Sequence, residues 1–146
     1  MAQLALHLSR EHYEHAMERS GGGPVPPALS LAEDSQYLRT IVRMVLDGEI
    51  STAVLVEVNE GISVPRAAMN HFVKSLKLGR KKVPAKVKAS FAVTMAVELG
   101  WAALEPYLLM ETGVEPKETE EVRAHAKVIA RRFMEQVGED LQGESR

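Results

Sequence analysis

Apolar residues recur along most of this chain at the three- and four-residue spacing of helices, and no sustained stretch alternates as a strand would. A clear stripe runs through 31–46, and another runs through 122–141. The stretch 89–110 is the most apolar of the chain, and from Ala89 onward the helix is apolar on nearly every side, so we expect it to be the central, buried helix. The pattern predicts an all-α protein, a compact bundle of about five to six helices.

Glycine and proline divide the chain near its start. Six of the seven residues from Gly21 to Pro27 are Gly or Pro, which predicts a break and a linker. We therefore predict an N-terminal helical arm at 1–20, a linker at 21–29 and a helical domain at 30–146. The apolar stripe of the arm is weak, and a tethered helix of this kind is suited to docking on a partner or a second protomer.

Capping residues place the helices of the domain. Ser30 and Glu33 form a capping box ahead of a helix that we expect to end at Gly48. Ser51 begins a short helix that ends before Gly61.

Later signals divide the second half in the same way. Ser63 caps a helix that runs to Leu78, and Pro84 opens the long apolar helix. We expect this helix to bend or end at Gly100 or at Pro106, and the last helix to cover 116–142, with acidic residues first and basic residues later.

Charge is strongly uneven, although the formal net charge is only −2. The segment 61–97 holds eight basic residues and no acidic one, whereas the remaining residues hold ten basic and twenty acidic ones, a net −10. Such asymmetry is typical of a surface that meets a polyanion. The alternative is that these cations pair with acidic side chains from other helices.

The segment 51–76 resembles a helix-turn-helix domain. A short helix is followed by the turn Glu60-Gly61-Ile62-Ser63 and then by a longer helix. One position departs from the pattern, because Glu57 stands four residues before the turn glycine, where such motifs hold a small residue. An ordinary αα-hairpin with the same caps is the alternative for 51–78.

The resemblance and the charge together predict a nucleic-acid interface. Arg66 and Asn70 near the start of the second helix would contact base edges, and Lys74 and the later cations would contact phosphates. Phe72 and Phe91 are too few to favour recognition by base stacking. The full predicted site is Ser63, Arg66, Asn70, Lys74, Lys77, Arg80, Lys81, Lys82, Lys86 and Lys88.

Catalysis and cofactors have little support in the sequence. The chain contains no Cys, which excludes disulfides, Cys-bound zinc and iron–sulfur clusters. The ridge of His7, Glu11 and His15 has ligand-type side chains, but one helix supplies too few of them, and a solvated face is the simpler interpretation. We expect no enzyme activity, no cofactor and no metal site.

The sequence thus favours a DNA-binding regulator or a small helical subunit of a nucleoprotein complex, with DNA favoured over RNA. The alternative is a helical protein–protein adaptor whose basic face binds an acidic partner. We expect a homo-oligomer formed through the C-terminal helix or the N-terminal arm. We also expect no membrane contact and a cytoplasmic location, because the N-terminus lacks the pattern of a signal peptide.

Overall fold

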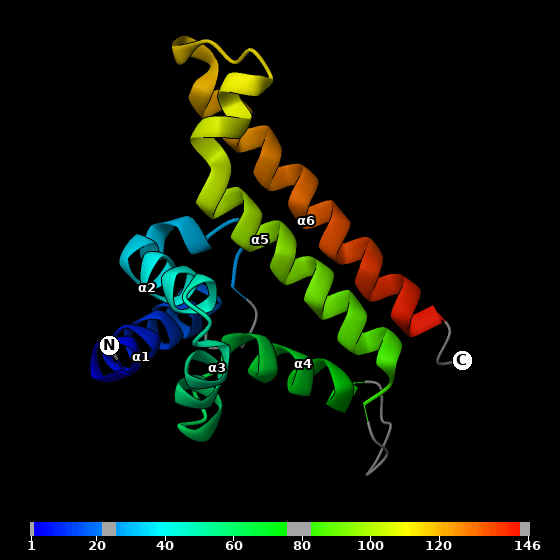
Figure 1. Ribbon diagram of the computed structural model, residues 1–146. Helices are drawn as coiled ribbons and strands as arrows, with labels where there is room; N and C mark the ends of the chain where they lie inside the picture. Colours follow the sequence, from blue (N-terminus) through cyan, green and yellow to red (C-terminus); the bar gives the residue numbers. More distant parts are fainter. Residues whose placement is uncertain (1, 22–25, 76–82, 144–146) are drawn as a thin grey trace. The chain divides into compact units, whose positions relative to one another are not determined.

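The computed structural model describes residues 2–21, 26–75 and 83–143 (Figure 1). Every regular element among these residues is helical, so the predicted all-α fold is confirmed. The chain falls into two compact units, Met1–Pro27 with Glu33–Lys77 and Ala28–Ala32 with Leu78–Arg146. The boundary between the units lies within the segment 30–146, which we expected to form one domain.

The first unit is built on three helices that pack on one another, α1 (Ala2–Arg19), α2 (Ser35–Leu46) and α3 (Ile50–Asn59), and it also contains α4 (Val64–Ser75). The inner stripe of α1 is formed by small and polar residues, which explains its weak apolar pattern. This stripe consists of Ala5, Leu8, Ser9, His12 and Ala16, all of them buried. The predicted arm therefore packs against α2 and α3 of its own chain.

The start of α2 differs from the prediction. The residues after Ser30 form a 3-10 helix, η1 (Leu31–Asp34), and α2 begins only at Ser35. Asp34 occupies the N-cap position but makes no side-chain cap hydrogen bond, because its carboxylate accepts hydrogen bonds from α1 instead. The α-helix therefore begins four residues later than we expected, and the capping box of Ser30 and Glu33 stays a prediction.

The second unit is an antiparallel hairpin of two long helices, α5 (Ala85–Glu111) and α6 (Thr119–Gly143). A 3-10 turn, η2 (Pro116–Glu118), precedes α6, and its start carries a capping box between Glu115 and Glu118. The Arg123 guanidinium on α6 ties the hairpin together, since its Nη2 lies 2.5 Å from Oε1 of Glu105 on α5. Ala130 and Leu141 are the buried residues of α6.

The helix α5 does not end at Gly100 or at Pro106 but continues to Glu111, with Pro106 inside it. The expectation of a buried central helix is wrong. Only Val87 of α5 is buried, so α5 is not the buried centre of a bundle. Among the described residues α5 is also the one helix whose length and apolar composition would suffice to cross a membrane, a criterion that the core helix of a soluble protein meets as well.

Candidate functional site

The turn between α3 and α4 has the geometry that the sequence predicts. Gly61 adopts φ +69°, a left-handed conformation that glycine tolerates best. The Ile62 N–H donates to the Glu57 carbonyl (2.9 Å) and the Gly61 N–H donates to the Val58 carbonyl (3.2 Å), which closes the end of α3. Ser63 is buried, and its Oγ accepts from the Arg66 N–H at 3.4 Å, which caps α4 as predicted.

One face of α4 is open to solvent and carries the predicted contact residues. Arg66, Asn70 and Lys74 follow one another at four-residue intervals, and all three are exposed. Val64 and Ala68, which lie on the opposite side of the helix, are buried. Within the described part of the chain, none of the three exposed side chains makes a hydrogen bond or an ion pair. The row of donors is therefore available to a partner.

The other predicted residues do not extend this row within the structure. Lys86 and Lys88 lie in the first turn of α5, which belongs to the second unit. The remaining cations lie outside the described residues: Lys77, Arg80, Lys81 and Lys82. A single continuous surface made by all ten residues stays a prediction.

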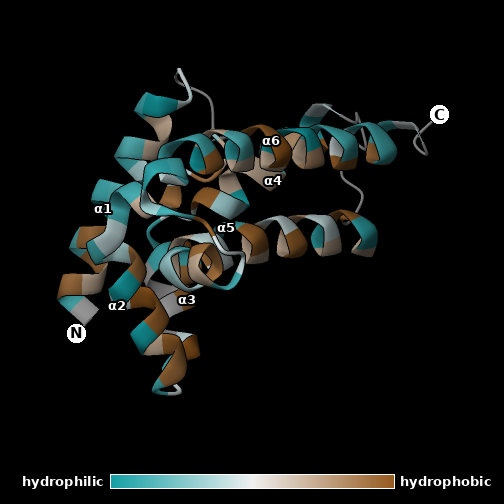
Figure 2. Cartoon of the chain, turned by 90° about the horizontal axis from the view of Figure 1, so that it is seen from above, coloured by the Kyte–Doolittle hydropathy of each residue, from teal (hydrophilic) through white to brown (hydrophobic). Residues whose placement is uncertain are grey.

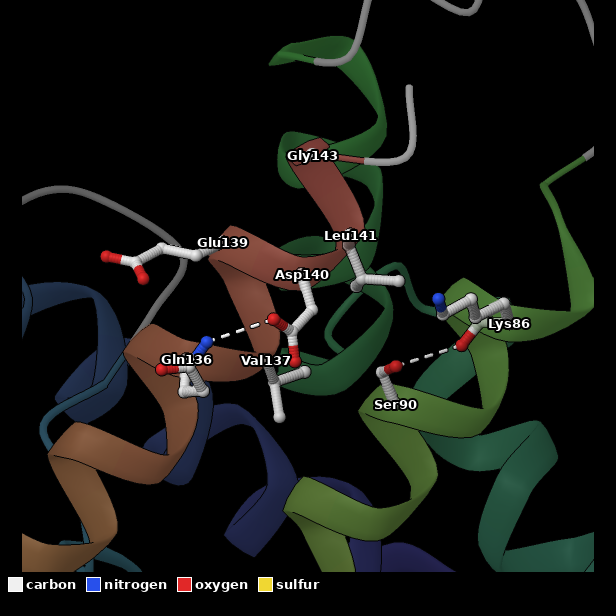
Figure 3. A pocket seen from close by; sticks show the side chains of 8 residues that line it. All are labelled: Lys86, Ser90, Gln136, Val137, Glu139, Asp140, Leu141 and Gly143. Carbon is white, nitrogen blue, oxygen red and sulfur yellow. Dashed lines mark hydrogen bonds between the residues drawn. The ribbon is translucent and has the colours of Figure 1, made fainter. Parts of the chain in front are cut away.

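Lys86 lines a pocket together with acidic residues, between the start of α5 and the end of α6 (Figure 3). The pocket has a volume of about 490 Å³, and Asp140 within it accepts from the Gln136 amide at 2.9 Å. Glu139 also lines it. Carboxylates thus accompany Lys86, which makes it a weaker candidate for contact with a polyanion than the residues of α4.

The first unit contains a polar cluster around Asp34 that the sequence did not predict. The Asp34 carboxylate accepts from His12 Nδ1 (2.7 Å), His15 Nδ1 (3.0 Å) and Arg19 Nη2 (2.7 Å), all on α1. The side chain of Asp34 is only 8% exposed and that of His12 only 10%, so their contact lies largely out of water, whereas His15 is 53% exposed. The three contacts join α1 to the start of α2.

The ionisation of this cluster follows from its contacts. The hydrogen bond to Asp34 raises the pKa of His15 and outweighs the smaller opposing effects of desolvation and of the nearby Arg19. Burial by itself raises the pKa of Asp34, but the hydrogen bonds from His15, His12 and Arg19 outweigh it and hold this pKa below its usual value. The folded state therefore favours a charged cluster in which Asp34 is ionised.

A second carboxylate completes the junction of the three helices. Glu57 of α3 accepts from the Tyr37 hydroxyl (2.5 Å) and from Ser9 Oγ (3.3 Å). The Tyr37 ring stacks on the His12 ring with centroids 4.1 Å apart, so the two carboxylate contacts form one network. Burial, followed by the nearby charge of Glu57, raises the pKa of Tyr37, which keeps its hydroxyl a neutral donor. Glu57, the departure from the helix-turn-helix pattern, thus anchors α3 to α1 and α2.

The side chains of His7, Glu11 and His15 on α1 do not converge on one site. His7 Nε2 lies 3.6 Å from Glu11 on the surface, whereas His15 turns to Asp34. Among the described residues, no group of three or more His, Asp or Glu side chains is arranged to hold a metal ion.

Comparisons with known proteins identify no relative: no family model, no curated protein sequence and no solved structure matches this chain.

Proposed function

We propose that the protein binds nucleic acid through the exposed face of α4. The observation that carries the proposal is the row of Arg66, Asn70 and Lys74, which is solvent-exposed and without intramolecular partners in the described chain. The row begins directly after a tight turn whose glycine and capping serine are in place. Four further cations follow α4 in the sequence, at Lys77 and within 80–82.

Each side chain of the row has a contact suited to its chemistry. The Arg66 guanidinium is able to donate two parallel hydrogen bonds to a guanine, and the Asn70 amide is able to pair with an adenine. Lys74, two turns further along α4, is a point charge suited to a phosphate. The three therefore combine base recognition with attachment to the backbone, as in a helix that enters the major groove.

The contacts of Glu57 in the first unit help to fix the position of α4. Glu57 is fixed by Tyr37 and Ser9, and it lies on the last turns of α3, just before the turn that leads into α4. Because α3 is held by two other helices, the direction in which the chain enters α4 is set by the first unit itself.

The test is fluorescence anisotropy with labelled duplex DNA, single-stranded DNA and RNA of equal length, at several salt concentrations. We expect the full chain to bind duplex DNA most tightly. The double variant Arg66→Ala/Lys74→Ala should weaken binding at least about tenfold and reduce the slope of log affinity against log salt by roughly 1 for each lost phosphate contact. Asn70→Ala should relax sequence preference and leave that slope unchanged.

The matched control is Arg131→Ala/Arg132→Ala, which removes the same charge from exposed positions of α6. Equal losses for the two double variants would contradict a specific role for α4. No binding to any of the three nucleic acids at low salt would overturn the proposal and leave an acidic protein partner as the alternative for the same face.

A further inference from the structure

A stripe of apolar residues lies on the outer surface of α5. Val93, Val97, Leu104 and Tyr107 are 53%, 39%, 50% and 59% exposed. Their spacings of four, seven and three residues place them on one face of the helix, because a turn takes 3.6 residues. Figure 2 shows apolar residues recurring along α5. Within the second unit, α6 leaves these side chains exposed.

Gly100 lies on the same stripe, between Val97 and Leu104. Glycine weakens a helix interior relative to alanine. Among the described residues nothing requires a glycine here, since a Cβ added to Gly100 would meet no atom within 4 Å. A missing side chain on an exposed helical face is of use where another backbone approaches closely.

The apolar stripe has the size of a small protein interface. From their exposed fractions, the four side chains of the stripe together expose on the order of 400 Å², about half of the roughly 800 Å² that each partner contributes to a standard interface. An apolar patch of this size on a soluble protein often marks a binding surface.

We propose that α5 pairs with α5 of a second copy of this chain in an antiparallel arrangement, with the two-fold axis at the level between Glu98 and Leu99. In this register Val97 of each copy lies opposite Gly100 of the other, and Val93 lies opposite Leu104. At two places in the pair, the Val97 side chain of one copy thus faces Gly100 of the other, which has no side chain. This allows the two helices to approach closely.

The charges at the two ends of the stripe favour the same register. Lys86 precedes the stripe and Glu111 follows it, and both are exposed. Lys86 already has carboxylates of its own chain nearby, so a contact with Glu111 of a second copy would add to these. The antiparallel register brings Lys86 of one copy to Glu111 of the other at both ends of the pair. A parallel pair would instead place Lys86 beside Lys86 and Glu111 beside Glu111, so like charges oppose it.

A lipid bilayer fits the stripe less well than a second copy does. The helix α5 is long enough to cross a bilayer, but Glu98 and Glu105 lie within its apolar stretch, and a charged side chain inside the hydrocarbon is costly.

Sedimentation equilibrium of the full chain without nucleic acid tests the proposal. We expect a reversible dimer that Val97→Glu converts to a monomer, with helix content by circular dichroism unchanged. The matched control is Met95→Glu, an apolar residue of the same helix that is 38% exposed on the opposite face, and this variant should remain dimeric. A monomeric wild-type chain, or equal effects of the two substitutions, would overturn the proposal.

Gly100→Ala provides a test that does not endanger folding, because alanine strengthens a helix. We expect it to weaken the dimer about tenfold by filling the space opposite Val97, whereas Gly138→Ala on α6, where a Cβ also meets nothing, should leave the dissociation constant unchanged. If Gly100→Ala dimerises as tightly as the wild type, the close approach at Gly100 does not exist. If the protein sediments together with phosphatidylcholine vesicles and Val97→Glu abolishes this, the stripe binds lipid instead.

The register is tested with cysteines, since the natural chain has none. A mixture of Val93→Cys and Leu104→Cys chains should form a disulfide-linked heterodimer on oxidation, while each variant alone should not cross-link. Cross-linking of each variant with itself would refute the antiparallel register.

Discussion

Replacing Asp34 by asparagine tests whether the polar cluster holds α1 on the first unit. The substitution keeps the size of the side chain but removes the charge that accepts from His12, His15 and Arg19. The asparagine carbonyl replaces only one of the two carboxylate oxygens, and an NH₂ group takes the place of the other. The bonds from His12 and Arg19 end on the same oxygen, so a carbonyl in that place keeps both without the charge and turns the NH₂ group to His15, whereas the opposite orientation loses both. In either case the donors lose their counter-charge.

The size of the loss follows from burial. A hydrogen bond to a charged group contributes about 1.5–3 kcal/mol, and a buried charge left without its partner costs more than the bond itself. His12 is only 10% exposed and Arg19 is 23% exposed, so their bonds to Asp34 keep most of this value, whereas His15 is 53% exposed and contributes little. We expect Asp34→Asn to lower the free energy of unfolding by about 2–4 kcal/mol at pH 6.

The difference between wild type and Asp34→Asn depends on pH in a direction that the pKa shifts determine. The pKa of His15 is raised from 6.5, so its contribution is complete below pH 6.5 and is lost as pH rises through the folded-state value. The pKa of Asp34 is lowered from 3.8, so its contribution is complete above pH 3.8 and is lost as pH falls through the folded-state value. The gap between the two proteins should be widest between these limits.

Urea unfolding followed by far-ultraviolet circular dichroism between pH 3 and pH 9 measures this gap. Asp47→Asn is the control, because it removes a carboxylate from the other end of α2 that is 57% exposed and pairs with Arg43 at 3.5 Å. Its loss should stay below about 1 kcal/mol at every pH. If Asp34→Asn costs no more than Asp47→Asn, or if its cost is the same at all pH values, the cluster does not hold α1.

Substitutions at three other positions each test one feature of the structure. Tyr37→Phe removes the donor to Glu57 and should cost about 1.5–3 kcal/mol in urea unfolding, and a loss below about 0.5 kcal/mol would contradict this hydrogen bond. Gly61→Ala should cost about 1 kcal/mol and Gly61→Asn less, because only the left-handed backbone resists a side chain there, and equal stabilities would show that the turn relaxes. Burial raises the pKa of Glu98 from 4.5, although the Leu29 N–H at 2.8 Å offsets part of the shift. Its charge is therefore unfavourable above the folded-state pKa and absent below pH 4.5, so Glu98→Gln should raise the melting temperature at pH 7 and leave it nearly unchanged below pH 4.5.

Local signals predicted the helices well where the capping residue had no other contact. Ser63 caps α4 and Gly61 ends α3, as their neighbours in the sequence indicated. The start of α2 was predicted too early: it begins at Ser35, and the Asp34 carboxylate at its N-cap position bonds to α1, a contact between residues 22 positions apart. No local pattern contains such a contact.

The candidate site was predictable to a similar extent. The exposure of Arg66, Asn70 and Lys74 follows from helical periodicity, since Val64 and Ala68 face the other way. The role of Glu57 was not predictable, because its partners Tyr37 and Ser9 come from two other helices. The expectation that α5 is the buried central helix was wrong. An apolar composition alone does not show whether other helices of the same chain cover a helix.

The stability of the second unit should depend on whether a second copy covers its outer face. Its buried apolar residues are few, Leu29, Val87, Ala130 and Leu141, and a small helical hairpin with so little burial gains stability when its outer face is covered. If a second copy covers it, dimerisation stabilises the folded state by mass action, by about 1.4 kcal/mol for each tenfold rise in protein concentration. Trp101 is the only tryptophan of the chain and lies on α5, so its fluorescence reports on this unit. We expect its melting temperature to rise by a few degrees for each tenfold increase in concentration, and by less in Gly100→Ala, whose dimer is weaker. A transition that does not move with concentration would show that the unit is stable without a partner.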